Sequence, residues 1–350
     1  MKYLSLSIIT FALILISNMS YGEQSCQSTG FVKLPDGILK SQDVSAIAKI
    51  DENGSLLVIG SDEGSSIQFL KKDRDESYGV HAPTIDLFNN TQEQGEEMDI
   101  EGLAVNADSL YVIGSHSSKR KKVKEDNEYQ INREKFHENK IKDEKDRDWL
   151  YRLKIDPQGK VEGELERKTL KLIIETDPVL SRFSKLPSKE NGVDIEGLAT
   201  KNNNLYVGFR GPVFRNNYVP IMKLKFDNIN STYDPNAYEV LYIQLGGRGI
   251  RDITSVSRGF LILAGPVGDG AASYQLYHWD GKDIIPGNDR RPQDIGNISL
   301  LCEIATPEDG KAEGIVDLST DGDTSYNLII VYDGVVNPDN LMQRFQVSKP

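Results

Sequence analysis

Cysteine, tryptophan and histidine are scarce in this 350-residue chain, which contains two, two and four of them. The chain has no CxxC, HExxH or GxSxG motif, so the commonest signatures of redox, zinc-protease and serine-hydrolase sites are missing. Basic residues are also in deficit, and the formal net charge is −12. That balance argues against nucleic acid as a partner and against general adhesion to anionic membranes.

Long apolar runs are absent except near the N-terminus. Lys2 precedes an apolar run over residues 4–16, and the small residues Ser20-Tyr21-Gly22 follow it. This run is shorter than the ~20 residues that a bilayer requires, and the layout is typical of a cleaved secretory signal. We predict a signal peptide over residues 1–22 and a soluble, monomeric, exported protein, periplasmic or secreted, without membrane insertion. Loss of Lys2 takes the net charge from −12 to −13.

The two cysteines, Cys26 and Cys302, stand near opposite ends of the chain. In an oxidising compartment such a pair indicates a disulfide bond. Two unpaired thiols are the alternative.

The hexapeptide DIEGLA occurs twice, starting at Asp99 and at Asp194. Looser copies are DVSAIA (43–48), DITSVS (252–257) and KAEGIVDL (311–318). The five copies begin 56, 95, 58 and 59 residues apart, so one interval carries a surplus. We assign this surplus to residues 117–148, a charged run with few apolar residues. Such a run is expected to be a loop insertion, either a solvated helix or a mobile flap.

Each repeat contains further short β-rich runs separated by Gly, Asn and Asp. The expected second strands are 56–61, 110–115, 205–210, 260–265 and 328–333. The expected third strands are 66–71, 149–155, 220–226, 274–279 and 342–347. The expected fourth strands are 83–88, 164–172, 238–245 and 299–304.

Four strands per unit at a fixed period predict an all-β fold, a single β-propeller over residues 30–348. The fifth unit lacks a fourth strand, which residues 30–35 would supply by closing the ring and removing an open edge. We predict five blades; six is the alternative if two have been merged.

In a propeller the first strands surround the central axis, so residues at matching positions should converge. The aligned acids are Asp43, Asp99, Asp194, Asp252, Glu101, Glu196 and Glu313, with Ser45 and Thr254 in place of the glutamate in two repeats. A second ring is expected at the ends of the second strands, formed by Asp62, His116, Arg210, Pro266 and Asp333. Its neighbours are Glu63, Arg248, Arg251, Lys119, Arg120 and Asp269. This concentration of charge predicts a ligand or metal site at one mouth of the channel.

The oxygen-rich set Glu101, Glu196, Glu313 and Asp252 favours Ca²⁺ over zinc. His116 and Glu101 are candidate acid–base residues. The residues predicted to bind ligand are Arg210, Arg248, Arg251, Asp62 and Asp333.

Two simpler interpretations stay open. The repeated carboxylates can bond backbone amides of the next blade, and we favour this for Asp99 and Asp194. His116 can be an ordinary loop histidine. The run LGGRGIRD at 245–252 is not a phosphate-binding loop, because it lacks the Lys-Ser/Thr ending and the strand–helix context.

Several segments in order resemble the bacterial family labelled "domain of unknown function 3616". They are DIEGLAV…LYVIGSHSSKRKK, DIEGLAT…LYVGFRGPV, GGRGIRDI…LILAGPVGD and YQLYHWDGK, spanning residues 40–335. That label implies no established activity. The Glu-Gly start of the first strands is also similar to esterase-like phytase domains and gluconolactonase-like calcium propellers. The second likeness implies calcium-assisted hydrolysis of a phosphate ester or lactone.

Two functions therefore follow as expectations. One is an exported hydrolase in which a metal or a Glu/His pair activates water against a small anionic ester held by arginines. The other is a propeller that binds a small anionic molecule or a protein at the same mouth without turnover.

Overall fold

The computed structural model describes residues 25–34, 37–88, 97–307 and 310–350. The predicted signal peptide, residues 1–22, lies outside this range. Within the described residues, no helix is both long and apolar enough to cross a membrane.

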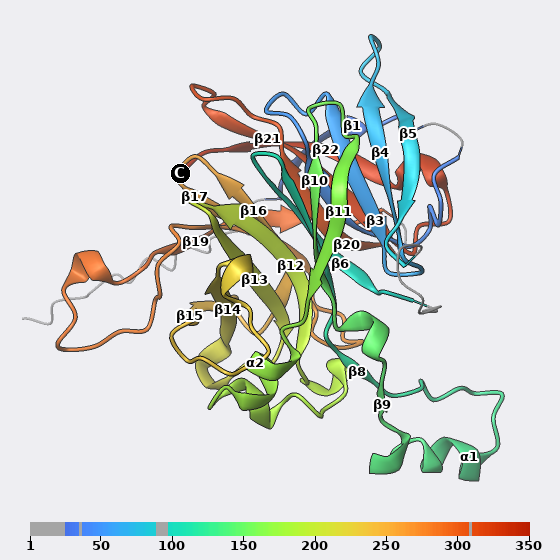
Figure 1. Cartoon of the computed structure of the whole chain (residues 1–350), viewed down its shortest axis with the longest axis vertical. Coiled ribbons are helices and arrows are strands. Elements are labelled where there is room, and N and C mark those ends of the chain that lie inside the picture. Colours follow the sequence, from blue (N-terminus) through green and yellow to red (C-terminus); the bar gives the residue numbers. More distant parts are fainter. Residues whose placement is uncertain (1–24, 35–36, 89–96, 308–309) are drawn as a thin grey trace, which may run out of the picture.

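Five four-stranded antiparallel sheets surround a common centre, as predicted (Figure 1). Blade 1 is β2 (Val44–Lys49), β3 (Leu56–Ser61), β4 (Ser66–Lys72) and β5 (Tyr78–Asp86). Blade 2 is β6 (Ile100–Asn106), β7 (Ser109–Gly114), β10 (Leu150–Ile155) and β11 (Val161–Lys168). Blade 3 is β12 (Asp194–Lys201), β13 (Asn204–Gly211), β14 (Tyr218–Leu224) and β15 (Tyr238–Gln244). Blade 4 is β16 (Gly249–Val256), β17 (Gly259–Gly265), β18 (Tyr274–Trp279) and β19 (Ile298–Ile304).

Blade 5 closes the ring with the two ends of the chain. It consists of β20 (Lys311–Asp317), β21 (Ser325–Asp333), β22 (Met342–Ser348) and β1 (Gln27–Phe31). The closing strand thus lies over 27–31 rather than the expected 30–35, and its pairing continues as far as a hydrogen bond from the Val32 amide to the Met342 carbonyl (2.9 Å). This arrangement leaves no blade without an outer strand.

Cys26 and Cys302 form a disulfide bond with a Cα–Cα distance of 5.1 Å. Cys26 directly precedes β1, and Cys302 lies in β19 of the preceding blade. The Cys26 amide also donates to the Glu303 carbonyl (2.8 Å). The bond therefore fastens the closing strand to its neighbour.

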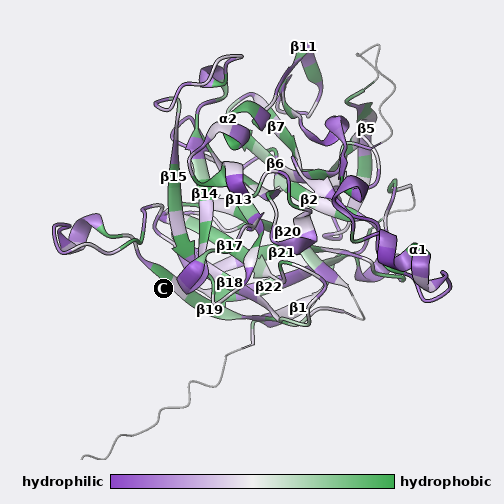
Figure 2. Cartoon of the chain, turned by 90° about the horizontal axis from the view of Figure 1, so that it is seen from below, coloured by the Kyte–Doolittle hydropathy of each residue, from purple (hydrophilic) through white to green (hydrophobic). Residues whose placement is uncertain are grey.

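The second strands carry the core. Every residue of β3, β7 and β17 is buried, which matches their continuous apolar sequence. The third strands mix buried with half-buried and exposed residues, as in β22. Seen with the molecule turned by 90°, β2, β6 and β20 lie near the centre (Figure 2).

The surplus in the second repeat has two parts. Residues 117–148 form an arm that extends from the blades, with β8 (Ser118–Lys119), β9 (Lys142–Asp143) and α1 (Tyr129–Glu134), and it is hydrophilic over α1 (Figures 1 and 2). Residues 169–193 form a second excursion containing α2 (Lys171–Thr176). The expected fourth strand at 164–172 is therefore wrong at its C-terminal end. Leu170, Ile173 and Ile174 are buried at helical spacing.

Short 3₁₀ helices occupy the connections. They are η1 (Glu138–Lys140), η2 (Lys145–Arg147), η3 (Leu180–Arg182), η4 (Ser188–Glu190), η5 (Arg215–Asn217), η6 (Phe226–Asn228), η7 (Pro292–Asp294) and η8 (Pro338–Asn340).

Candidate functional site

A β-bulge interrupts the first strand of every blade at the same place. A bulged residue is left out of the ladder, so its side chain can be directed differently from its neighbours. The five bulged residues are Ser45, Glu101, Glu196, Arg251 and Glu313, which we call the bulge ring. Four of its five members are charged, and they come from segments far apart in the sequence.

The glycine that follows the glutamate in DIEGLA is required by the packing of adjacent first strands. A Cβ added to Gly102 would lie 2.8 Å from the Leu198 Cβ and 3.0 Å from the Leu198 amide nitrogen. Real Cβ atoms do not approach that closely, so β6 and β12 could not keep this spacing with a larger residue. The repeated Glu-Gly pair thus combines a charged residue with a close strand contact.

The predicted alignment of the fourth repeat is wrong by three residues. Ile250 pairs with Ala264 and Asp252 with Leu263, so Arg251 occupies the glutamate position and Asp252 the glycine position. The Asp252 carboxylate accepts hydrogen bonds from the amides of Ile253 and Ile315, both at 2.7 Å. Asp252 therefore joins blades 4 and 5, and each of its carboxylate oxygens accepts a hydrogen bond from a backbone amide. Thr254 lines a separate cavity at the opposite end of the channel.

Arginines neutralise two of the three glutamates in the bulge ring. Arg210 Nη1 lies 2.5 Å from Glu196 Oε1, and Arg210 also contacts Asp194. Arg251 Nε lies 3.0 Å from Glu196 Oε2, and its Nη2 contacts Glu313. Burial opposes the charge of Arg251, but Glu196 and Glu313 outweigh it and hold its pKa well above the ordinary value. Two of the four predicted calcium ligands, Glu196 and Glu313, thus already have cationic partners.

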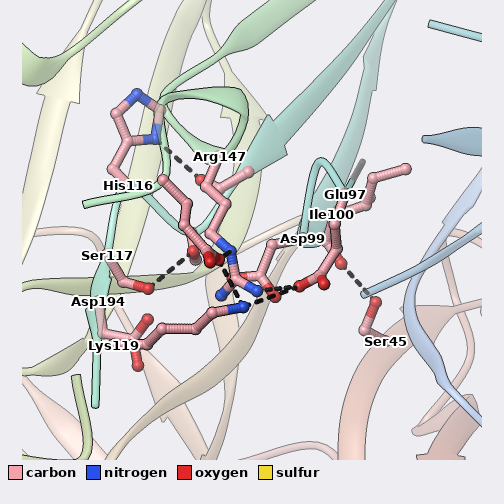
Figure 3. A network of polar contacts seen from close by, with 12 residues as sticks. Ser45, Glu97, Asp99, Ile100, His116, Ser117, Lys119, Arg147 and Asp194 are labelled. Atoms are coloured by element: carbon pink, nitrogen blue, oxygen red, sulfur yellow. Dashed lines mark hydrogen bonds and ion pairs between the residues drawn. The ribbon is translucent and has the colours of Figure 1, made fainter. Parts of the chain in front are cut away.

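A third buried arginine, Arg147, enters the same region from the base of the arm. Its Nη1 lies 2.6 Å from Asp99 Oδ2, its Nε lies 3.0 Å from Glu144 Oε2, and it also contacts Glu97 (Figure 3). The carboxylates of Asp99 and Asp194 therefore form ion pairs with arginines, whereas hydrogen bonds to backbone amides were expected. Arg147 was not predicted as a site residue, because it lies within the charged run 117–148. Its place two residues before the third strand was the available signal.

His116 does not take part in this cluster. Its Nδ1 bonds the Gly114 carbonyl (2.9 Å), and its Nε2 accepts from the Leu170 amide (3.2 Å). Because Nε2 accepts a hydrogen bond, it carries no proton and the ring is neutral, and burial lowers the pKa of His116 in the same sense. Figure 3 shows the imidazole pointing away from Glu97 and Asp99. The predicted acid–base pair of His116 and Glu101 is not brought together.

The predicted second ring is also shifted in two blades. The register aligns Asp62, Ser115, Arg210, Gly265 and Asp333. His116 and Pro266 therefore lie one residue beyond the equivalent positions. Arg248, a predicted ligand-binding residue, donates through Nε to the Ser273 carbonyl (2.7 Å) and through Nη2 to the Ser273 hydroxyl (2.9 Å). It does not line the mouth.

Three carboxylates lie together beside the bulge ring. One oxygen each of Asp43, Asp62 and Asp333 falls within 4.8 Å of the others. Burial, then Asp333 and Glu313, raise the pKa of Asp62 to about 7. Lys311 contacts Asp333 and supplies one positive charge. These oxygens suit a hard cation better than the set predicted from the sequence.

Glu101 differs from the other glutamates of the bulge ring. Among the described residues, its carboxylate has no hydrogen-bond donor and no cationic partner. Burial raises its pKa well above the ordinary value, and Glu196 and Asp99 raise it further. Glu101 is thus a carboxyl group that holds its proton more tightly than an exposed glutamate does.

These side chains line a cavity of about 1150 Å³ at one mouth of the channel. Its wall includes Glu101, Asp62, Arg210 and Arg251, and the arm contributes Lys119 to Val123 to its rim. The opposite mouth holds a cavity of about 600 Å³ with no lining residue in common. The opposite cavity is lined by the aliphatic residues that follow the bulges, Ile47, Leu103, Leu198, Ile253 and Ile315. The bulge ring therefore lines one end of the channel, while the charged residues of the other cavity (Lys49, Asp51, Glu52, Asp108 and Asp156) lie outside it.

The chain is thus a five-bladed β-propeller with a pocket of charged side chains at one mouth of its central channel. Residues 43–347 match the family described as "Protein of unknown function (DUF3616)", and the chain belongs to that family. No curated protein sequence matches it.

Solved structures with a similar arrangement have low sequence identity. The WD40 propeller domain of Doa1 is 9% identical, with 89% of this chain and 70% of that chain covered and a TM-score of 0.33. A protein from Lactobacillus plantarum is 12% identical, with 87% and 72% covered and a TM-score of 0.34. YCF48 bound to D1 peptide is 9% identical, with 94% and 73% covered and a TM-score of 0.34. At these TM-scores the similarities have no bearing on the site.

Proposed function

We propose that the protein binds a small molecule in the charged mouth of its channel, with Glu101 as the principal contact. The observation that carries this proposal is the free carboxyl group of Glu101. In the same bulge ring, Glu196 and Glu313 each contact a guanidinium. A carboxyl group in that environment, without a partner in the described chain, is available to a ligand.

The network around Glu101 is suited to binding because it is already assembled. The side chains of Arg210, Arg251 and Glu196 are almost fully buried, and the Glu196 carboxylate contacts both arginines. Long side chains held in this way lose little additional freedom when a ligand arrives. The cavity of about 1150 Å³ slightly exceeds the usual range of a small-molecule pocket, ~300–1,000 Å³.

Binding without turnover is favoured over hydrolysis by the position of His116. Both ring nitrogens of His116 are bonded within the protein, so the predicted histidine acid–base group is not offered to the mouth. Hydrolysis is retained as a second candidate because of two observations. The raised pKa of Glu101 suits a general acid, and the oxygens of Asp43, Asp62 and Asp333 would accept calcium.

We also propose that the protein works outside the cytoplasm, in the periplasm or as a secreted protein. The bond between Cys26 and Cys302 supports this, since structural disulfides persist mainly in oxidising compartments.

A thermal-shift screen of polar metabolites tests the binding proposal. Ligands of the mouth should raise the melting temperature of the wild-type protein and lose that effect in Glu101→Gln. Glu52→Gln is the matched control, because Glu52 lies at the opposite cavity. A ligand that acts equally on both variants does not bind at Glu101. If every ligand found behaves that way, the proposal is wrong.

A panel of phosphate esters, carboxylic esters and lactones, each with calcium and with EDTA, separates the two candidates. Turnover that requires calcium and falls in Asp62→Asn would establish the hydrolase. Ligand-induced stabilisation with a flat panel would establish the binding protein.

A further inference from the structure

Most charges around the mouth are already paired, so the unpaired ones indicate what a ligand must supply. On the floor, Arg147 contacts Asp99, Arg210 contacts Asp194, and Lys311 contacts Asp333. On the rim, Lys119 pairs with Glu144 (2.5 Å), Arg120 with Glu190 (2.5 Å) and Lys189 with Asp269 (3.1 Å).

The groups left unpaired on the floor are carboxyl groups. Among the described residues that line the cavity, Glu101 and Asp62 have carboxylates without an ion pair. The Asp62 Oδ1 atom is buried and accepts no hydrogen bond there. The neighbouring acids show what this wall accepts, because each of Asp99, Asp194 and Glu196 contacts a guanidinium group. A cationic group of a ligand would complete the pattern.

The charges left on the rim are positive. Lys121 and Lys122 line the same cavity, are exposed, and contact no carboxylate in the described part of the chain. Lys135 also lines it and donates to the Lys122 carbonyl (2.8 Å) and to Asn132 Oδ1 (3.1 Å), both of them uncharged groups. These three ammonium groups make the rim locally positive, although the net charge of the chain is −12.

Deepening the proposed function on which it rests, we infer that the ligand is an extended amphoteric molecule. Its ammonium or amidinium end lies against Glu101 and Asp62, and its carboxylate or phosphate end lies against Lys121, Lys122 and Lys135. Phe136, which is 67% exposed at the same rim, offers an apolar surface to the outer part of the ligand. The size of the cavity suits such a molecule better than a single ion.

Probes of equal length and different charge test the orientation. The series is an ω-amino acid, the corresponding α,ω-diamine and the corresponding dicarboxylate, at six, eight and twelve carbons. Affinity is measured by isothermal titration calorimetry on the full chain. We expect the amino acid to bind most tightly at one of these lengths, at least about threefold better than either symmetrical probe, since each end adds an ion pair worth up to ~1 kcal/mol.

Two variants and two matched controls assign the ends. Glu101→Gln should weaken the amino acid and the diamine by up to about fivefold and leave the dicarboxylate unchanged. The double variant Lys121→Gln, Lys122→Gln should weaken the amino acid and the dicarboxylate about threefold and leave the diamine unchanged. The controls are Glu52→Gln at the opposite cavity and Lys124→Gln, which lies on the arm outside the lining.

The outcomes separate this inference from the proposal beneath it. If a symmetrical probe matches or exceeds the amino acid at every length, or if no probe binds, the amphoteric assignment is wrong. The binding proposal still stands in those cases if screened ligands lose their effect in Glu101→Gln. If Glu101→Gln alters neither screened ligands nor probes, both are wrong.

Discussion

Arg251 occupies in the fourth blade the position that Glu196 holds in the third, and its Nε lies 3.0 Å from the Glu196 carboxylate. The repeat has therefore changed sign in one blade, and the new charge is satisfied by the equivalent residue of its neighbour. This substitution turns a ring of like charges into a connected ion-pair network on the axis of the propeller.

Removal of Arg251 tests the structural weight of that network. Arg251→Met should lower the free energy of unfolding by about 3–5 kcal/mol, because Glu196 and Glu313 would be left buried with one cation fewer. Urea denaturation measures the change. Arg291→Met is the control, since Arg291 is 72% exposed and its pair with Asp294 should be worth less than ~1 kcal/mol. Equal effects of the two substitutions would contradict the network.

The stability of the protein should depend on Asp62 between pH 4 and 7. Its pKa rises from 3.8 to about 7 on folding, so the folded state binds the proton more tightly than the unfolded state. That contribution is present at low pH and is lost as pH rises through 7. The melting temperature of the wild type should therefore fall more between pH 5 and pH 8 than that of Asp62→Asn. Asp126→Asn, at an exposed position on the arm, should behave as the wild type.

His116 should matter for stability and not for ligand binding. His116→Ala removes the acceptor of the Leu170 amide and should cost about 1–3 kcal/mol. Ligand-induced shifts in melting temperature should persist in this variant. If this variant loses the ligand-induced shifts while circular dichroism shows an intact fold, His116 does take part in ligand binding.

The disulfide should stabilise the closure of the ring. Cys26→Ser with Cys302→Ser should lower the free energy of unfolding by about 2–5 kcal/mol. Intact-mass analysis of the wild type after alkylation should find no free thiol before reduction and two after it. Alkylation of either cysteine in the native, unreduced protein would contradict the bond.

The fold could be predicted because its signal is repeated. Five copies of a set of short apolar strands, separated by turns, predict five blades. Each copy makes the strand assignment of the others more secure. The details that failed are those where one copy departs from the rest. The excursion at 169–193 was not predicted, because α2, which begins at Lys171, follows β11 without a proline or glycine between them.

The site could be predicted only in part, because a β-bulge changes which residues face the channel and no sequence pattern showed where it falls in blade 4. Aligning DITSVS with DIEGLA placed Asp252 in the metal set, whereas the bulge in blade 4 falls at Arg251. Likewise, the residue of blade 2 that is equivalent to Arg210 is Ser115, and the predicted His116 lies one position further along the chain. Arg147 was missed since its partners Asp99 and Glu97 are about 50 residues away in the chain. Such contacts depend on the ring and not on local pattern.

The most direct test of the binding site is a crystal structure of the protein with the ligand that stabilises it most. We expect ligand density in the mouth lined by the bulge ring, with a polar atom within hydrogen-bonding distance of the Glu101 carboxyl group. Density confined to the opposite cavity around Ile47 and Leu103, or to the outer faces of the blades, would contradict it.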